Sequence, residues 1–165
     1  SEHGGSVTSA QGIETVTNYS FEDAPQFEII MIPGGMGTRT EVNNPAMLEF
    51  LRTQDKGTEY TTSVCTGSAV LAKAGLLDGH KATSNKMAWK FATSQDDDVL
   101  WQSRARWVED GKYITSSGIS ADMALGLVEK IDGREKAEQV AKTAEYIWND
   151  DPSNDPFAVD ETNMN

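Results

Sequence analysis

The sequence predicts an α/β domain with a mainly parallel sheet, helices on both faces, and a cysteine at a sharp strand-to-helix turn. An apolar run that stops abruptly at a Pro-Gly-Gly segment, as Phe27–Ile32 does, is typical of a buried parallel strand. Segments with helical spacing alternate with these runs, and that alternation indicates the α/β class. A length of 165 residues fits one domain with enough chain to bury a core.

The first half of the chain alternates strand and helix signals. Asn44 is a plausible helix cap and Pro45 suits a first helical turn, whereas Gly75 closes a second apolar helix. The expected elements are, in order, a short strand or edge hairpin over 7–17, a loop over 18–26, a strand over 27–32, a helix over 45–56, a strand over 58–64 and a helix over 67–74.

The second half adds a hairpin and two longer helices. Asp110-Gly111 between two apolar runs is a strong hairpin signal, and Asp132-Gly133 separates two helical patterns. The expected elements are a strand over 81–84, a helix over 86–94, strands over 104–109 and 113–115, helices over 121–131 and 134–148, and an irregular acidic tail over 149–165.

Charge and cysteine content narrow the classes of function. The 14 Lys and Arg against 26 Asp and Glu give a formal charge of -12, which argues against a nucleic-acid partner bound through a broad basic face. No apolar stretch reaches the roughly 20 residues of a membrane span, and residues 1–5 do not resemble a signal peptide. The single cysteine excludes an internal disulfide and fits a reducing compartment, so we expect a cytoplasmic protein that is not in a membrane.

Cys65 is the candidate nucleophile. It follows a strand and precedes a helix, a placement that favours the thiolate and resembles the elbow that exposes a hydrolase nucleophile. Gly67 and Ser68 supply the small residues that such a crowded turn requires. A buried cysteine that only fills space is the alternative. His3 and His80 are the available bases, and both are expected at the surface, His80 at the opposite end of the sheet.

Other chemistry-bearing residues have structural explanations. One cysteine and two scattered histidines give no zinc-type spacing, so we expect no metal and no other cofactor. Asp96–Asp98 fits a solvated acidic loop. The four tryptophans fit a core or a dimer interface. Asp122 fits a carboxylate that caps a helix start.

Several motifs together resemble the ThiJ/PfpI superfamily. They extend over nearly the whole chain and are the segments 30–35 (IMIPGG), 62–68 (TSVCTGS), 74–79 (AGLLDG), 81–86 (KATSNK), 104–111 (RARWVEDG) and 115–120 (TSSGIS). The resemblance implies a flavodoxin-like three-layer sandwich, related to the class I glutamine amidotransferase fold, and usually a homodimer. The Cys-Thr-Gly-Ser segment looks most like the isocyanide (isonitrile) hydratase members.

By resemblance, Cys65 and Thr66 would be catalytic, and Gly34, Gly35, Thr66 and Gly67 would bind the substrate or an oxyanion. The thiolate would attack the carbon of a small isocyanide, and water would release an N-substituted formamide from a thioimidate. In the family a strand, a helix and a strand bring an Asp or Glu to the cysteine. We therefore expect a single ThiJ/PfpI-like domain over 1–165 that lacks this N-terminal portion and the partner acid.

Two departures and several alternatives accompany this resemblance. Protease-like members have histidine where this chain has Thr66, which argues against a peptidase, and many relatives have histidine at the position of Asn85. The alternatives are a glyoxalase or deglycase that acts on methylglyoxal or glycated adducts, and a redox-sensing or chaperone-like dimer in which Cys65 is oxidised. The sensor domain of a transcription regulator fits less well, because a net charge of -12 would repel DNA.

Overall fold

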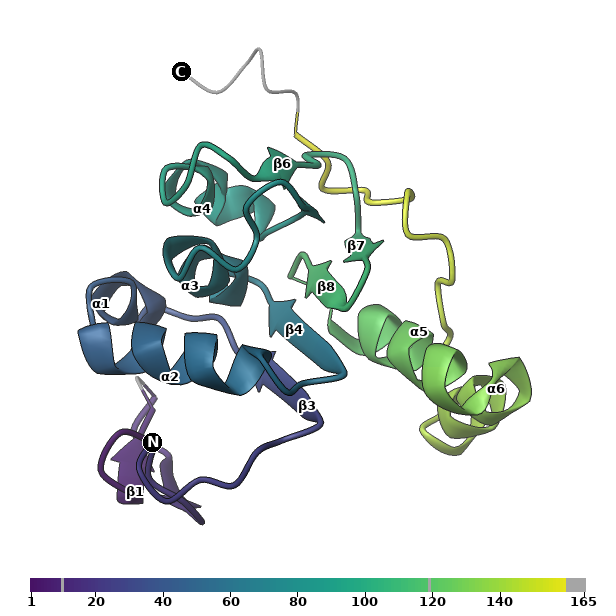
Figure 1. Cartoon of the computed structure of the whole chain (residues 1–165). Helices are drawn as coiled ribbons and strands as arrows, with labels where there is room; N and C mark the ends of the chain where they lie inside the picture. Colours follow the sequence, from purple (N-terminus) through teal and green to yellow (C-terminus); the bar gives the residue numbers. More distant parts are fainter. Residues whose placement is uncertain (10, 119, 160–165) are drawn as a thin grey trace.

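A four-stranded sheet with strand order β3-β4-β8-β7 forms the centre of the molecule (Figure 1). The computed structural model describes residues 1–9, 11–118 and 120–159. The strands β3 (Ile29–Ile32), β4 (Tyr60–Val64) and β8 (Tyr113–Ser116) run parallel. The antiparallel β7 (Trp107–Asp110) joins β8 through the expected Asp110-Gly111 turn. This confirms the predicted α/β fold with a mainly parallel sheet.

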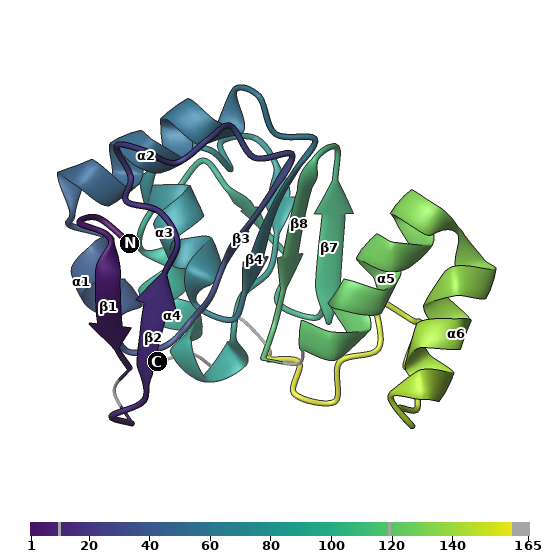
Figure 2. The same ribbon diagram turned by 90° about the horizontal axis from the view of Figure 1, so that it is seen from below.

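Helices cover both faces of the sheet, so the fold is a flavodoxin-like three-layer sandwich (Figure 2). One layer contains α1 (Thr38–Glu41), α2 (Pro45–Asp55), α3 (Gly67–Lys73) and α4 (Trp89–Thr93). The other contains α5 (Ser120–Asp132) and α6 (Arg134–Thr143). Alternate residues of β8 enter the two cores, with Tyr113 on the α2 and α3 side and Ile114 on the α5 side.

The predicted N-terminal hairpin consists of β1 (Gly5–Thr8) and β2 (Glu14–Thr17), which lie apart from the main sheet, near α2 and β3 (Figures 1 and 2). A further small parallel sheet pairs β5 (Lys81–Ala82), the first half of the strand predicted over 81–84, with β6 (Leu100–Trp101), which was not predicted. The helix α1 was not predicted, because a four-residue helix carries too little periodicity to detect.

Two helix predictions need correction. The helix expected over 134–148 ends at Thr143, because Glu145 adopts a left-handed φ of 52° and turns the chain back toward α5. The helix expected over 86–94 begins as a 3₁₀ turn, η1 (Lys86–Ala88), with Asn85 as its cap. Residues 149–159 contain no helix or strand, and residues 160–165 of the predicted acidic tail lie outside the described residues.

A buried carboxylate connects the second helical layer to the tail. Asp122 is fully buried and accepts hydrogen bonds from both the Nε and Nη2 of Arg106, the first at 2.7 Å. Its other oxygen accepts from the Tyr146 hydroxyl at 2.9 Å and the Asn149 N–H at 3.0 Å. We expected only a capping role for Asp122, but its chief partners are distant in sequence. Within the described residues, no helix is long and apolar enough to span a bilayer.

Candidate active site

A sharp turn joins the end of β4 to the start of α3 (Figure 1). Cys65 lies in this turn, directly after β4. Its φ of 58° is left-handed, a conformation that non-glycine residues adopt rarely and that is typical of constrained functional turns. The Cys65 N–H lies 3.1 Å from the carbonyl oxygen of Ser116 and 3.0 Å from that of Ser117. The neighbouring parallel strand therefore holds the turn in place, and the cysteine is partly exposed.

The glycine at position 34 leaves room beside the cysteine. A β-carbon at Gly34 would lie 2.6 Å from the Cys65 Cβ and 2.7 Å from the Thr66 nitrogen. Both distances are shorter than non-bonded contacts allow, so only glycine fits there without displacing the elbow. Gly67 is equally constrained, because a β-carbon would lie 2.1 Å from the Ile32 carbonyl oxygen. These contacts bring the end of β3 against the elbow, as its position in the sheet requires.

We expect Gly34→Ala to reduce turnover by about a hundredfold, because displacing the thiol by even 1 Å disrupts the reacting geometry. The assay is initial-rate kinetics on the substrates considered below. Gly37→Ala is the matched control in the same loop, since a β-carbon there meets nothing within 4 Å. Equal rates for the two variants would show that the close approach at Gly34 has no bearing on turnover.

The Thr66 side chain links the loop that contains Gly34 and Gly35 to the elbow. It is almost fully buried, and its Oγ1 accepts from the Gly35 N–H and from the Thr38 hydroxyl, both at 3.0 Å. The Thr38 hydroxyl is also 2.7 Å from the Gly35 carbonyl oxygen. Gly35, which has a φ of 126°, thus directs its N–H to a side chain in this structure. The Thr66 hydroxyl supports the loop, and the backbone N–H of the same residue lies beside the Gly34 α-carbon.

We expect Thr66→Val to lower the free energy of unfolding by about 1 kcal/mol, because valine keeps the shape of threonine but leaves the Gly35 N–H without its acceptor, whereas the Thr38 hydroxyl keeps the Gly35 carbonyl oxygen. Urea unfolding followed by circular dichroism measures this change. Thr40→Val, at an exposed position of α1, should stay within about 0.5 kcal/mol of the parent protein. A Thr66 variant as stable as the Thr40 variant would contradict the proposed role of this hydroxyl.

A second set of side chains, from the segment after β5, reaches the backbone of the elbow. The Cys65 carbonyl oxygen accepts from the Ser84 and Ser68 hydroxyls, each at 3.1 Å. The Lys86 ammonium, in turn, is 3.2 Å from the Ser84 carbonyl oxygen and 3.4 Å from the buried Asp155 carboxylate. Burial lowers the pKa of Lys86, and the nearby Asp155 opposes that shift. Ser84 and Lys86 were not predicted as residues of the site, since neither lies near Cys65 in sequence.

The two histidines lie away from the elbow. The His80 imidazole is 3.4 Å from Asp110 and its ring packs on Tyr113, which pairs with Thr61 at the opposite end of β4 from Cys65. His3 is exposed beside Glu2. Asn85 uses its carbonyl oxygen to cap η1, and its Nδ2 faces Gly118. In the part of the chain that the structure describes, no group of three or more His, Cys, Asp or Glu side chains has the geometry of a metal site.

Several known proteins are similar to this chain in sequence. The family model of the DJ-1/PfpI family matches residues 1–130. An isonitrile hydratase of Pseudomonas putida is 37% identical over 142 residues, which are 85% of this chain and 61% of the relative. The HTH-type transcriptional regulator CdhR of Pseudomonas aeruginosa is 30% identical over 146 residues, covering 86% of this chain and 42% of the regulator.

Solved structures agree with this relationship. A ThiJ/PfpI family protein from Pseudomonas syringae superimposes with a TM-score of 0.75 at 32% identity, covering 88% of this chain and 61% of the other. DJ-1beta of Drosophila melanogaster gives a TM-score of 0.74 at 25% identity, covering 88% and 79%. This chain thus spans 61% of the length of the isonitrile hydratase. On the sequence match over 130 residues and the shared fold, the chain belongs to the DJ-1/PfpI family.

Proposed function

We propose that the protein is a cysteine-dependent enzyme that hydrates a small isocyanide to an N-substituted formamide. The observation that carries this proposal is the strained, partly exposed Cys65 at the end of a parallel strand, with a glycine loop packed against it. Ligands of open parallel sheets bind at this edge. The 37% identity to an isonitrile hydratase supports this choice of substrate.

The proposed reaction consumes one water and proceeds in two stages. The Cys65 thiolate attacks the terminal isocyanide carbon, and that carbon takes a proton, which gives a thioimidate bonded to sulfur. Water then adds to the same carbon and its nitrogen takes a proton. The C–S bond breaks as the added hydroxyl gives up its proton, which replaces the proton taken by the carbon, so the thiolate returns and the formamide leaves. The net change is the addition of water to the isocyanide, without an oxidant or cofactor.

The residues around Cys65 have distinct proposed roles in this reaction. Gly34 keeps the approach to sulfur open, and the Thr66 N–H at the start of α3 stabilises charge that develops on the substrate. Gly67 lets the helix pack closely enough against β3 to form this pocket. Gly35 gives the loop its positive φ of 126°, and the Thr66 hydroxyl holds Gly35 in place. Thr66 thus acts through its backbone on substrate and through its side chain on the loop.

The test is direct detection of product. Purified protein is incubated with small alkyl and aryl isocyanides, and the formyl proton of the N-substituted formamide is followed by NMR. The proposal requires formamide at a rate well above that of buffer. Methylglyoxal is assayed in parallel. Consumption of methylglyoxal without any formamide from isocyanides would replace the hydratase by the glyoxalase alternative, because both reactions need the same thiol.

A non-catalytic role is the second candidate, and the regulator and DJ-1 relatives favour it. In that role Cys65 is oxidised to a sulfinate by peroxide, which is detected as a mass increase of two oxygen atoms. We further propose that the protein works in the cytoplasm as a homodimer. Sedimentation velocity tests the dimer, and fractionation of the source cells tests the location.

A further inference from the structure

The C-terminal segment, residues 149–159, contains no helix or strand, yet it is attached at specific points to the rest of the protein. It follows α6 and runs back past β7 toward β6 (Figure 1). Its Pro152 carbonyl oxygen accepts from the Arg106 N–H at 2.7 Å. Three residues further on, the side chain of Asp155 has no exposed surface. Because carboxylates are almost never fully buried unless they are paired, Asp155 marks a specific attachment.

The partner of Asp155 is the buried ammonium of Lys86. The Asp155 Oδ2 is 3.4 Å from the Lys86 Nζ, and the Asp155 Oδ1 accepts from the Phe157 N–H at 3.0 Å. Within the described residues Oδ2 makes no hydrogen bond, so the ammonium charge compensates its burial. The same Nζ donates to the Thr83 hydroxyl and to the Ala105 carbonyl oxygen, both at 2.7 Å. Lys86 thus joins three segments that are distant in sequence.

One path of contacts connects this ion pair to the carbonyl oxygen of Cys65. The Lys86 ammonium is 3.2 Å from the Ser84 carbonyl oxygen. The Ser84 hydroxyl donates to the Cys65 carbonyl oxygen at 3.1 Å. The position of Ser84 against the elbow therefore depends on Lys86, and that of Lys86 depends on Asp155.

A second path connects the C-terminal segment to the N–H of Cys65. The Cys65 N–H donates to the Ser117 carbonyl oxygen at 3.0 Å, and the Ser117 N–H donates to the Arg106 carbonyl oxygen at 2.9 Å. The N–H of Arg106 is the donor to Pro152. Both backbone polar groups of Cys65 are therefore linked to the C-terminal segment through a few contacts.

The conformation of Cys65 needs this kind of support. Its φ of 58° is unfavourable for a residue with a side chain, and such a conformation persists only where the surrounding contacts hold it. Loss of a contact that holds the backbone of Cys65 would let the turn relax. The thiol would then leave the position that the reaction requires.

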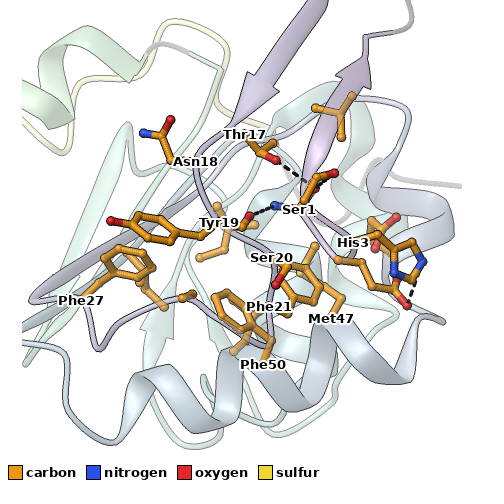
Figure 3. Close-up of a pocket in the computed structure, with 18 of the residues that line it drawn as sticks. Ser1, His3, Thr17, Asn18, Tyr19, Ser20, Phe21, Phe27, Met47 and Phe50 are labelled. Atoms are coloured by element: carbon orange, nitrogen blue, oxygen red, sulfur yellow. Dashed lines mark hydrogen bonds and ion pairs between the residues drawn. The ribbon is translucent and has the colours of Figure 1, made fainter.

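These contacts lie apart from the cavity of about 810 Å³ between the N-terminal segment and α2 (Figure 3). Aromatic rings line that cavity, such as Phe21 stacked on Phe50 with ring centroids 4.3 Å apart. Its lining includes no residue of 63–68, 83–86 or the C-terminal segment. A molecule bound in the cavity would therefore touch none of the contacts that connect Asp155 to Cys65.

We propose that Asp155 is a positioning residue for the reaction at Cys65, since its ion pair with Lys86 fastens the C-terminal segment and thereby holds the elbow in its strained conformation. This role rests on the hydratase activity proposed above. Asp155 acts through Lys86 and Ser84 on the backbone of the nucleophile and does not itself touch the substrate.

The first test replaces Asp155 by asparagine. Asparagine keeps the size of aspartate and can still accept from the Phe157 N–H, but it removes the charge opposite the ammonium. We expect hydrogen exchange of the Cys65 and Ser117 amides to accelerate by at least about tenfold, because the backbone that holds both N–H groups opens more often. NMR of the backbone amides in the full chain measures this change.

Asp150→Asn is the matched control. Asp150 lies in the same C-terminal segment, but it pairs with Arg134 at the surface, where its side chain is 50% exposed. The same chemical change there should leave the exchange of the Cys65 and Ser117 amides as it is in the parent protein.

Kinetics with an isocyanide tests the same two variants in the reaction. For Asp155→Asn we expect kcat to fall by at least about tenfold and KM to change by less than about twofold, because the thiol is displaced while the groups that bind substrate are kept. Asp150→Asn should keep both constants. Failure of the parent protein to form formamide would reject the proposed function, and the exchange measurement would still decide whether Asp155 holds the elbow.

A double variant separates positioning from stability. Lys86→Met with Asp155→Leu replaces both buried charges by apolar side chains, so the melting temperature should return to within about 5 °C of the parent. The ammonium that contacts Ser84 is absent, so we expect amide exchange and kcat to stay at the level of Asp155→Asn.

Three results would overturn the proposal. The first is a folded Asp155→Asn protein whose Cys65 and Ser117 amides exchange as slowly as in the parent. The second is equal acceleration in Asp150→Asn, which would show that the ion pair with Lys86 has no special part. The third is a double variant that recovers the melting temperature and the slow exchange together, which would make the pair a contribution to stability alone.

Discussion

Replacing Cys65 by serine should lower the rate of formamide formation by at least about a thousandfold, because the hydroxyl is not ionised at neutral pH and cannot supply the attacking thiolate. Serine nearly matches cysteine in size and can adopt the same turn, so the protein should keep its fold. Initial rates with an isocyanide, measured at equal concentrations of folded protein, give the result. Thermal melting of both proteins confirms that folding is unchanged.

Ser68→Ala is the matched control for this experiment. Its hydroxyl donates to the Cys65 carbonyl oxygen at 3.1 Å, so the variant alters the same elbow without touching the sulfur. We expect its rate to remain within about tenfold of the parent, in line with loss of one supporting hydrogen bond. A Cys65→Ser protein that retains the parent rate would reject the cysteine mechanism, whatever the substrate.

Replacing Asp122 by alanine should destabilise the protein by about 3–5 kcal/mol, because it leaves the Arg106 guanidinium buried without its counter-charge. The change also removes the acceptor of the Tyr146 hydroxyl and the Asn149 N–H. For a chain of this size the melting temperature should fall by about 6–20 °C. Differential scanning calorimetry measures it.

Two further variants separate the effect of burying the charges from the effect of pairing them. Asp150→Ala removes the same kind of Arg–Asp pair at the surface, with Arg134, and should cost less than about 1 kcal/mol. The double variant Arg106→Met, Asp122→Leu removes both buried charges and should recover much of the lost stability. A loss no larger for Asp122→Ala than for Asp150→Ala would mean that this buried network contributes little to folding.

The order of the main strands and helices followed from local patterns. Phe27–Ile32 and Thr58–Val64 end at glycine-rich or cysteine-containing turns, and the Asp110-Gly111 hairpin is found where it was predicted. The ends of elements were less predictable. The last helix carries its apolar pattern beyond Thr143, yet the tail folds back because Asp122 binds Tyr146 and Asn149, a contact without any local signal.

The candidate site also contains residues that local patterns predict and residues that they do not. The elbow position of Cys65 was predictable, because a strand pattern before it and a helix pattern after it are both local. The contacts of Ser84 with the elbow and of Lys86 with Ser84 were not predictable, because they form only when β5 packs near β8. That the Thr66 hydroxyl accepts hydrogen bonds from Gly35 and Thr38 was likewise not predictable, because both donors lie about thirty residues away in the chain.

By itself the sequence determined the fold class, the parallel strands and the cysteine elbow, because each depends on the periodicity and turn chemistry of neighbouring residues. Tertiary structure alone decided which backbone atoms hold the elbow, why positions 34 and 67 must be glycine, and where the buried Asp122 finds its partners. It also showed that, in the part of the chain that the structure describes, β3 pairs with β4 alone. These features depend on contacts between segments far apart in the chain, and such distances exist only after the sheet and both helical layers have packed.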